Sequence, residues 1–167
     1  MSIPSGVTEI ARGAFEACSN LQTIELPTTL KTIGDYVFNN CSKLTSLAIP
    51  EGVTSIGASS VRGCSRLMWA SLPSTIQTIG ENAFYSNNNM TTIVLPNATP
   101  TIGSGAFTYL SALVNVCFKG TASQWSSSGQ STYGQYFSSA QVYYYSSSQP
   151  SGAGYYWHYL DGAPTPW

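Results

Sequence analysis

Cysteine and histidine are the residue types in this chain that could do chemistry. Cys18, Cys41 and Cys64 follow one another at equal, 23-residue intervals, and Cys117 stands outside their series. Regularly placed thiols could bind a metal ion or form a disulfide. No histidine accompanies the three spaced thiols, which disfavours zinc, and an odd number cannot pair completely. We predict that Cys18, Cys41 and Cys64 form a buried ladder of small apolar side chains, whereas Cys117 is either exposed or covered by the tail.

The one histidine, His158, lies between Trp157 and Tyr159 and close to Asp161. An Asp–His pair is one part of a hydrolase site, so a hydrolase that uses His158 is the enzymatic hypothesis. Such an enzyme also needs a positioned nucleophile and an oxyanion hole, and no sequence motif supplies either. We therefore predict that the protein is not an enzyme and has no cofactor and no metal site.

The chain that must position these side chains is built on an exact 23-residue repeat. Prolines mark it at Pro4, Pro27, Pro50, Pro73 and Pro96. The same step connects the isoleucines Ile10, Ile33, Ile56, Ile79 and Ile102, and the glycines Gly34, Gly57, Gly80 and Gly103. A third series consists of Phe15, Phe38, Phe84 and Phe107, with Val61 in the third copy. One such unit cannot bury its apolar edge, so the sequence predicts stacked units that share a single core.

Each unit reads L-x-x-I-x-L-P, followed by an I-G pair and by A-F-x-x-C. The alternation in I-x-L is typical of a strand with one buried face, and proline ends that strand because it cannot donate to a ladder. The I-G pair predicts a turn in which glycine permits a positive φ. The A-F-x-x-C segment predicts one short helical turn whose alanine, phenylalanine and cysteine face inward.

These columns resemble the BspA-like, or treponemal-type, leucine-rich repeats of bacterial surface proteins, over about residues 3–118. The resemblance implies a right-handed leucine-rich-repeat solenoid with short parallel β-strands and short helical or irregular return segments. About five 23-residue repeats would be followed by an aromatic C-terminal cap. The resemblance also implies an exported or cell-surface bacterial protein, in some members an adhesin that binds host or matrix proteins.

Composition limits the partners. Charged residues make up 8% of the chain and the formal net charge is -1, so nothing favours nucleic acid or an acidic membrane surface. No apolar run approaches the roughly 20 residues that span a bilayer, and no signal peptide is present. We interpret Met1 as a truncation start, with any export signal upstream. We expect an extracellular or cell-surface protein, most simply a monomer.

Alternation along the strands places two residues of each unit on the outer face of the sheet. Among these, the candidate ligand-binding residues are Thr23, Glu25, Ser46, Trp69, Ser71, Thr92, Val94 and Asn115. Trp69 is the sharpest candidate because aromatic side chains dominate interface energetics. However, Ala70 and Val61 replace larger core residues in the same repeat, so Met68 or Trp69 could instead bend inward and refill the core.

The repeat breaks down after residue 118, and we divide the chain into leucine-rich repeats (1–118) and a degenerate repeat with a C-terminal cap (119–167) of the same structural domain. Val142–Tyr145 resembles Val116–Phe118 at a spacing of 26. Residues 155–162 predict a last strand and turn. The tail aromatics Tyr143, Tyr145 and Trp157 could stack on carbohydrate, although a cap over the last repeat is favoured.

The sequence thus favours a non-catalytic module that binds a host or matrix protein or a glycan. The alternative is a structural spacer or C-terminal capping segment of a longer surface protein.

Overall fold

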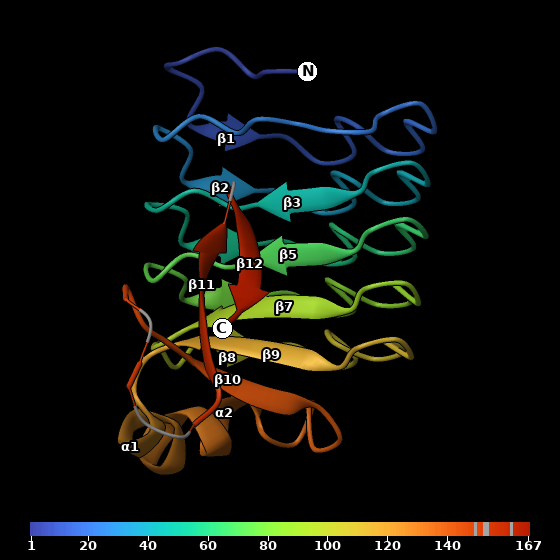
Figure 1. The fold of residues 1–167 in the computed structure, drawn as a ribbon. Coiled ribbons are helices and arrows are strands. Elements are labelled where there is room, and N and C mark those ends of the chain that lie inside the picture. The colour runs from blue at the N-terminus through green and yellow to red at the C-terminus, as the bar shows by residue number, and fades with distance from the viewer. Residues whose placement is uncertain (149, 152–153, 161) are drawn as a thin grey trace.

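The structure is a computed structural model, which describes residues 1–148, 150–151, 154–160 and 162–167. The chain winds into a stack of coils with a sheet on each of two sides (Figure 1). The first sheet has the order β1 (Glu9–Ile10), β2 (Thr32–Ile33), β4 (Ser55–Ile56), β6 (Thr78–Ile79) and β8 (Thr101–Ile102). The second has the order β3 (Ser46–Ala48), β5 (Trp69–Ser71), β7 (Thr92–Pro96), β9 (Asn115–Lys119), β10 (Gln141–Tyr145), β11 (Tyr156–Leu160) and β12 (Ala163–Pro166). Among the described residues, all strand pairs are parallel except that of β11 with β12.

The register of both sheets follows the sequence repeat. Ile33 pairs with Ile56 in the first sheet, and Leu47 pairs with Ala70 in the second, so each residue lies opposite its equivalent in the next copy of the repeat. The predicted leucine-rich-repeat solenoid is therefore confirmed.

The apolar columns form one continuous core inside the coils. In the middle repeats the side chains are fully buried, as shown by Phe38, Leu47, Leu67 and Leu95, each at 0% exposure. Their equivalents in the first coil, such as Phe15, are only partly buried because no coil packs on their outer side. Each repeat is thus stabilised by the apolar surface that it buries against the repeats on either side.

Two local predictions were wrong. The isoleucine of the I-G pair lies in a first-sheet strand, and the glycine after it is needed for close packing rather than for a positive φ. A Cβ at Gly80 would lie 2.5 Å from the amide nitrogen of Ala58 in the preceding coil. The A-F-x-x-C segments form successive turns, not a helical turn, because left-handed residues such as Tyr36 (φ 57°) and Asn40 (φ 58°) interrupt them.

The tail continues the solenoid and then folds back onto it. Three short helical segments, α1 (Ala122–Gln124), η1 (Trp125–Gly129, a π-helix) and α2 (Gln130–Tyr133), form an insertion after β9. This insertion and the segment that follows it carry Trp125, Tyr133 and Phe137 into the core at its C-terminal end, where they act as an aromatic cap. Strand β10 then pairs with β9 so that Val142 lies opposite Val116, the expected spacing of 26.

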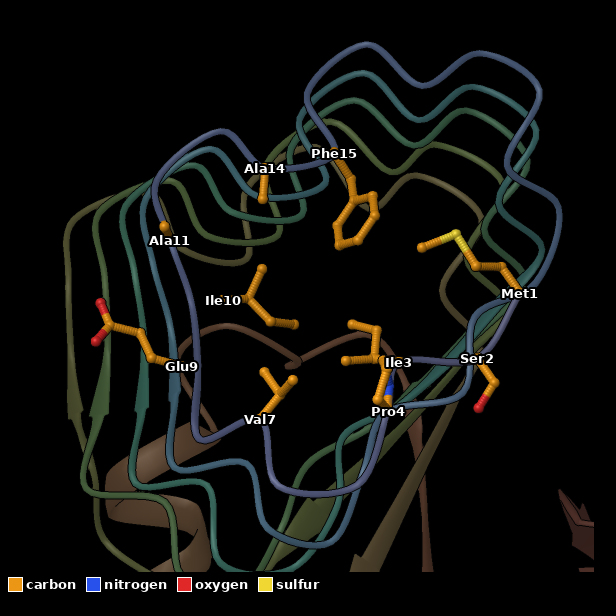
Figure 2. A pocket seen from close by; sticks show the side chains of 10 residues that line it. All are labelled: Met1, Ser2, Ile3, Pro4, Val7, Glu9, Ile10, Ala11, Ala14 and Phe15. Carbon is orange, nitrogen blue, oxygen red and sulfur yellow. The ribbon is translucent and has the colours of Figure 1, made fainter.

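The terminal aromatic segment, which we expected over the last repeat, lies elsewhere. Strands β11 and β12 form an antiparallel hairpin, which crosses the outer face of the second sheet in front of β5, β7 and β9 (Figure 1). At the other end of the molecule the first coil is open. Figure 2 shows Ile3, Val7, Ile10 and Phe15 pointing into this opening, a hollow of about 270 Å³.

Candidate binding surface of the second sheet and its tail

The hairpin covers the later half of the outer sheet face. Trp157 in β11 is 0% exposed and packs in a separate cluster with Val94, Cys117 and Tyr143. The Trp157 indole N–H donates to the carbonyl of Phe118 at 3.0 Å, which fixes the hairpin against β9. The predicted outward direction of Val94 and Cys117 therefore does not expose them, because the tail supplies a second apolar layer on this face.

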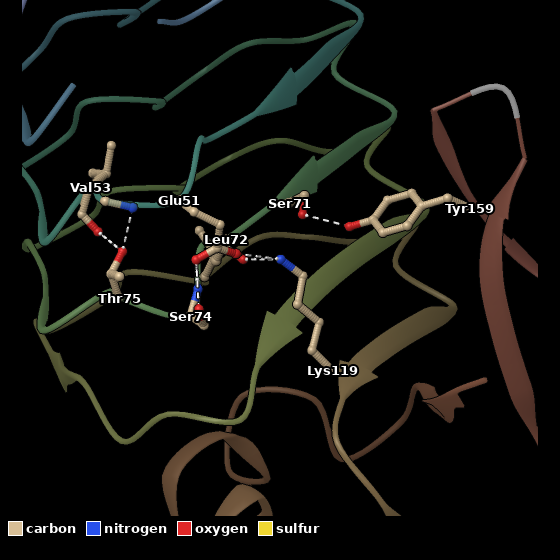
Figure 3. A network of polar contacts seen from close by, with 9 residues as sticks. Glu51, Val53, Ser71, Leu72, Ser74, Thr75, Lys119 and Tyr159 are labelled. Atoms are coloured by element: carbon tan, nitrogen blue, oxygen red, sulfur yellow. Dashed lines mark hydrogen bonds and ion pairs between the residues drawn. The ribbon is translucent and has the colours of Figure 1, made fainter. Parts of the chain in front are cut away.

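The hydroxyl groups of Ser71 and Tyr159 extend this contact toward β5. Their oxygens are 3.2 Å apart, and Ser71 is buried at 5% exposure (Figure 3). Thr92 is also buried, at 7% exposure, and accepts a hydrogen bond from the half-buried Asn115 at 3.4 Å. The candidate residues Ser71, Thr92 and Val94, which we expected on an open surface, are thus buried, and Ser71 and Val94 contact the tail.

The earlier half of the same face remains open. Thr23 and Glu25 are exposed, and Ser46 is half-buried. Trp69 lies opposite Ser46 and Thr92 in the register of β5, on the outer side of the sheet and half-buried. The core below it is made by Ala70, at 0% exposure. The interpretation of Trp69 as an outward residue is therefore correct, and the alternative in which it refills the core is wrong.

Met68, the other candidate for refilling the core, is 51% exposed. It lines a hollow of about 390 Å³ together with Arg66, Thr45 and Thr91. Arg66 and Met68 are exposed and come just before the half-buried Trp69 in the chain. We call Arg66, Met68 and Trp69 the Trp69 patch.

The tail aromatics occupy different positions from one another. Tyr143 is half-buried and packs with the Trp157 cluster, whereas Tyr145 is 47% exposed. The ring centroid of Tyr145 lies 5.2 Å from that of Trp157, and Tyr159 lies 5.0 Å away on the same indole. Of the three predicted tail residues, Tyr145 alone presents much of its surface to solvent.

A polar cluster lies beside these rings that was not predicted from the sequence. Glu51, in the turn after β3, accepts hydrogen bonds from the Ser74 amide at 2.8 Å and the Ser74 hydroxyl at 2.6 Å (Figure 3). Lys119, at the end of β9, lies 3.3 Å from the Glu51 carboxylate and donates to the Leu72 carbonyl at 3.0 Å. Burial raises the pKa of Glu51, but the hydrogen bonds from Ser74 and the charge of Lys119 outweigh that effect, so its pKa is lowered.

Two departures from the repeat could have revealed this cluster. Lys119 stands where the proline of the repeat would fall in the copy that follows Pro96. Glu51 stands in a column that is otherwise Ser, Thr or Asn. In a chain with only 6 basic and 7 acidic residues, these substitutions bring opposite charges together across 68 positions of sequence.

The cysteine column is mainly structural. Cys41 and Cys64 are 0% exposed, and their thiols donate to the carbonyls of Phe15 and Phe38, both at 3.1 Å. Burial raises the pKa of Cys41 to about 11 and that of Cys64 to about 12. The buried ladder is therefore confirmed for these two residues, but Cys18 is exposed because it lies on the open first coil.

All four cysteines are free, and no group of three or more His, Cys, Asp or Glu side chains within the described ranges could hold a metal ion. Burial raises the pKa of Cys117 to about 12 as well, since the hairpin covers it. None of the three buried thiols is a favourable nucleophile, because the thiolate is the reactive form.

His158 stacks on Trp167, with ring centroids 3.7 Å apart and an interplanar angle of 11°. Among the residues whose placement is described, no serine or cysteine hydrogen-bonds to its ring. The proposed Asp161 partner lies outside the described residues. The geometry around His158 therefore gives no support to a hydrolase.

The repeat matches a known family along most of its length. The model of the BspA type leucine-rich repeat region matches residues 1–114, in six copies. This chain is a BspA-type leucine-rich-repeat protein. The family identifies it as a leucine-rich-repeat module.

Solved structures agree with this assignment. A leucine-rich-repeat protein of T. pallidum is 32% identical, with a TM-score of 0.67, over 70% of this chain and 57% of its own. A leucine-rich cell surface protein of Faecalibacterium prausnitzii is 31% identical, with a TM-score of 0.69, over 75% of this chain and 33% of its own. The pneumococcal vaccine antigen PcpA, 18% identical over 88% of this chain and 36% of its own with a TM-score of 0.69, shares the fold.

This BspA-type chain thus spans about 57% and 33% of the lengths of the first two of these proteins. No curated protein matches it. Within the described residues, no helix is both long and apolar enough to cross a bilayer.

Proposed function

We propose that this BspA-type module is an adhesion module of a bacterial surface protein and that it binds a protein partner through the Trp69 patch. The observation that supports this most strongly is the outward, half-buried Trp69 on the part of the sheet that the tail leaves open. Tryptophan, arginine and methionine are enriched at the centres of protein interfaces. The cell-surface description of the F. prausnitzii protein supports an extracellular location.

The small number of charges on the open face determines how binding to a protein partner should depend on salt. Glu25 and Arg66, the ionisable residues among the candidates named on this face, are both exposed. Exposed charges contribute little at physiological ionic strength. We therefore expect apolar burial around Trp69 to dominate the affinity, with little dependence on salt.

Binding of the purified chain to immobilised extracellular-matrix proteins tests the proposal. For a matrix protein that binds, we expect Trp69→Ala to weaken binding by about 30-fold, the effect of a hot spot worth about 2 kcal/mol. Trp167→Ala is the matched control, because Trp167 is 45% exposed and lies on the tail. If a Trp69→Ala, Glu25→Ala double variant bound every such protein as tightly as the wild type, the open face would not be the binding surface.

We also propose, as a second role, that the chain closes the C-terminal end of a longer solenoid. The asymmetry of the two ends supports this role, since Trp125 and Phe137 fill the C-terminal end whereas Phe15 and Ile10 line an open hollow (Figure 2). Grafting one further repeat ahead of Ile3 should raise the free energy of unfolding. An unchanged or lower stability would contradict this role.

A further inference from the structure

The most distinctive hollow outside the Trp69 patch lies where the hairpin meets the turns that follow β3 and β5. It measures about 300 Å³ and is lined by Glu51, Ser74, Lys119, Tyr145, Trp157 and Tyr159. The hairpin supplies part of its wall, because Trp157 and Tyr159 belong to β11, while Tyr145 belongs to β10. We call it the hairpin cleft.

One side of the hairpin cleft is aromatic. Tyr145 is 47% exposed and Tyr159 is 42% exposed, and both lie against the edge or face of the buried Trp157 ring. Trp157 is held by its bond to Phe118, and Tyr159 by its contact with Ser71. The rings of Trp157 and Tyr159 are therefore held in place before any ligand arrives, which reduces the entropy lost on binding.

The other side carries paired acceptors and donors. The Glu51 side chain is 56% exposed and that of Lys119 is 23% exposed, so both groups keep part of their surface toward solvent. Ser74 holds the carboxylate and Leu72 holds the ammonium group, as Figure 3 shows. A carboxylate accepts hydrogen bonds and an ammonium group donates them, so the pair offers both functions within 3.3 Å.

This combination selects a class of ligand. Because Glu51 and Lys119 neutralise each other, the cleft has no net charge to attract an ion. A sugar ring presents C–H groups on a face, which suit the negative faces of aromatic rings. Its hydroxyl groups both donate and accept, as the Glu51–Lys119 pair requires. A site of this volume lies at the lower end of the range for small-molecule pockets, about 300–1,000 Å³, and suits a single residue of a glycan.

We propose that the hairpin cleft binds a neutral saccharide unit, which packs on Tyr145 and Tyr159 and hydrogen-bonds to the Glu51–Lys119 pair. This site is separate from the Trp69 patch. A protein contact and a glycan contact on one module would act independently, so the failure of either proposal leaves the other intact.

A panel of neutral methyl glycosides, titrated into the intact chain and followed by protein NMR, tests the proposal. We expect at least one glycoside to shift the Trp157 indole and Tyr145 resonances with a dissociation constant in about the millimolar range, as befits a small exposed site. Tyr145→Ala should weaken this binding by about tenfold. Tyr109→Ala is the matched control, because Tyr109 is 61% exposed and is not among the residues that line the cleft.

A second variant, Glu51→Gln, tests glycoside binding without removing an aromatic ring that contacts the hairpin. It keeps the size of the side chain and should weaken glycoside binding, while the NMR resonance of the Trp157 indole N–H, which donates to Phe118, stays unchanged. No shift of the cleft resonances by any glycoside would overturn the proposal. Equal binding by wild type and Tyr145→Ala, or a response to inorganic phosphate alone, would overturn it as well.

Discussion

The glycines that follow the first-sheet strands give the sharpest test of how the coils pack, and Gly80→Ala is the substitution to make. A Cβ at Gly80 would lie 2.5 Å from the Ala58 nitrogen and 2.6 Å from the carbonyl carbon of Gly57. Carbon atoms in contact are ordinarily about 3.5–4.0 Å apart, so the two coils must separate by about 1 Å. That movement stretches the bond from the Gly80 amide to the Ile56 carbonyl, which is now 2.8 Å.

The free energy of unfolding should therefore fall by about 3 kcal/mol, the sum of about 2 kcal/mol for overpacking and about 1 kcal/mol for the weakened hydrogen bond. Chemical denaturation followed by circular dichroism measures this change. Gly13→Ala is the control, because Gly13 has φ +66° and its nearest neighbour, a Glu16 carboxylate oxygen, is 3.4 Å away. It should lose only about 1 kcal/mol, the penalty for a left-handed residue. If Gly80→Ala were no more destabilising than Gly13→Ala, close coil packing would not be the reason for this glycine column.

The tail and the cysteine column give three further predictions. Trp157→Ala should release the hairpin, seen as faster hydrogen exchange in β11, while the repeats keep their exchange protection, since each coil depends on its neighbours. Asn87 stands 23 residues after Cys64 and continues the cysteine column; it is fully buried and hydrogen-bonds to the backbone of Cys64, Val61 and Phe84. Asn87→Ala should reduce the free energy of unfolding by about 3 kcal/mol and Asn87→Cys by less, as measured by chemical denaturation. Because the folded pKa of Glu51 is lowered, its stabilising contribution is present above the ordinary carboxyl pKa of about 4.3 and is lost as the pH falls through the folded value. This loss, smaller than about 1 kcal/mol for so exposed a group, should disappear in Glu51→Gln when hairpin stability is followed by fluorescence across that range.

The repeat made most of the fold predictable. Burial alternates with the strand period, so the inward direction of Leu47 and Ile93 and the outward direction of Trp69 could be read from the sequence. The equivalence of Val142 with Val116 was also recoverable, because a short insertion leaves the strand pattern intact.

The contacts of the tail could not be predicted in the same way. Strand alternation states which side of a sheet a residue faces, but not what covers that side, so Val94 was correctly oriented and wrongly expected to be exposed. The contacts of Trp157 with Val94 and of Tyr159 with Ser71 join segments that are far apart in the sequence and have no periodic relation. The glycine column shows a further limit. Glycine occurs both where two coils approach closely and where the backbone adopts a left-handed turn, so the sequence alone does not distinguish the two causes.

The accessibility of the Cys117 thiol tests most directly whether the tail covers the later half of the sheet face. Brief alkylation of the native chain at about pH 8, with each cysteine quantified by mass spectrometry, should modify Cys18 rapidly and Cys117 slowly. A buried thiol with a pKa of about 12 is ionised to only about one part in ten thousand at that pH. Removing residues 155–167 should make Cys117 react rapidly, while Cys41 and Cys64 stay protected. If Cys117 in the intact chain reacted as fast as Cys18, the hairpin would not lie on the sheet face.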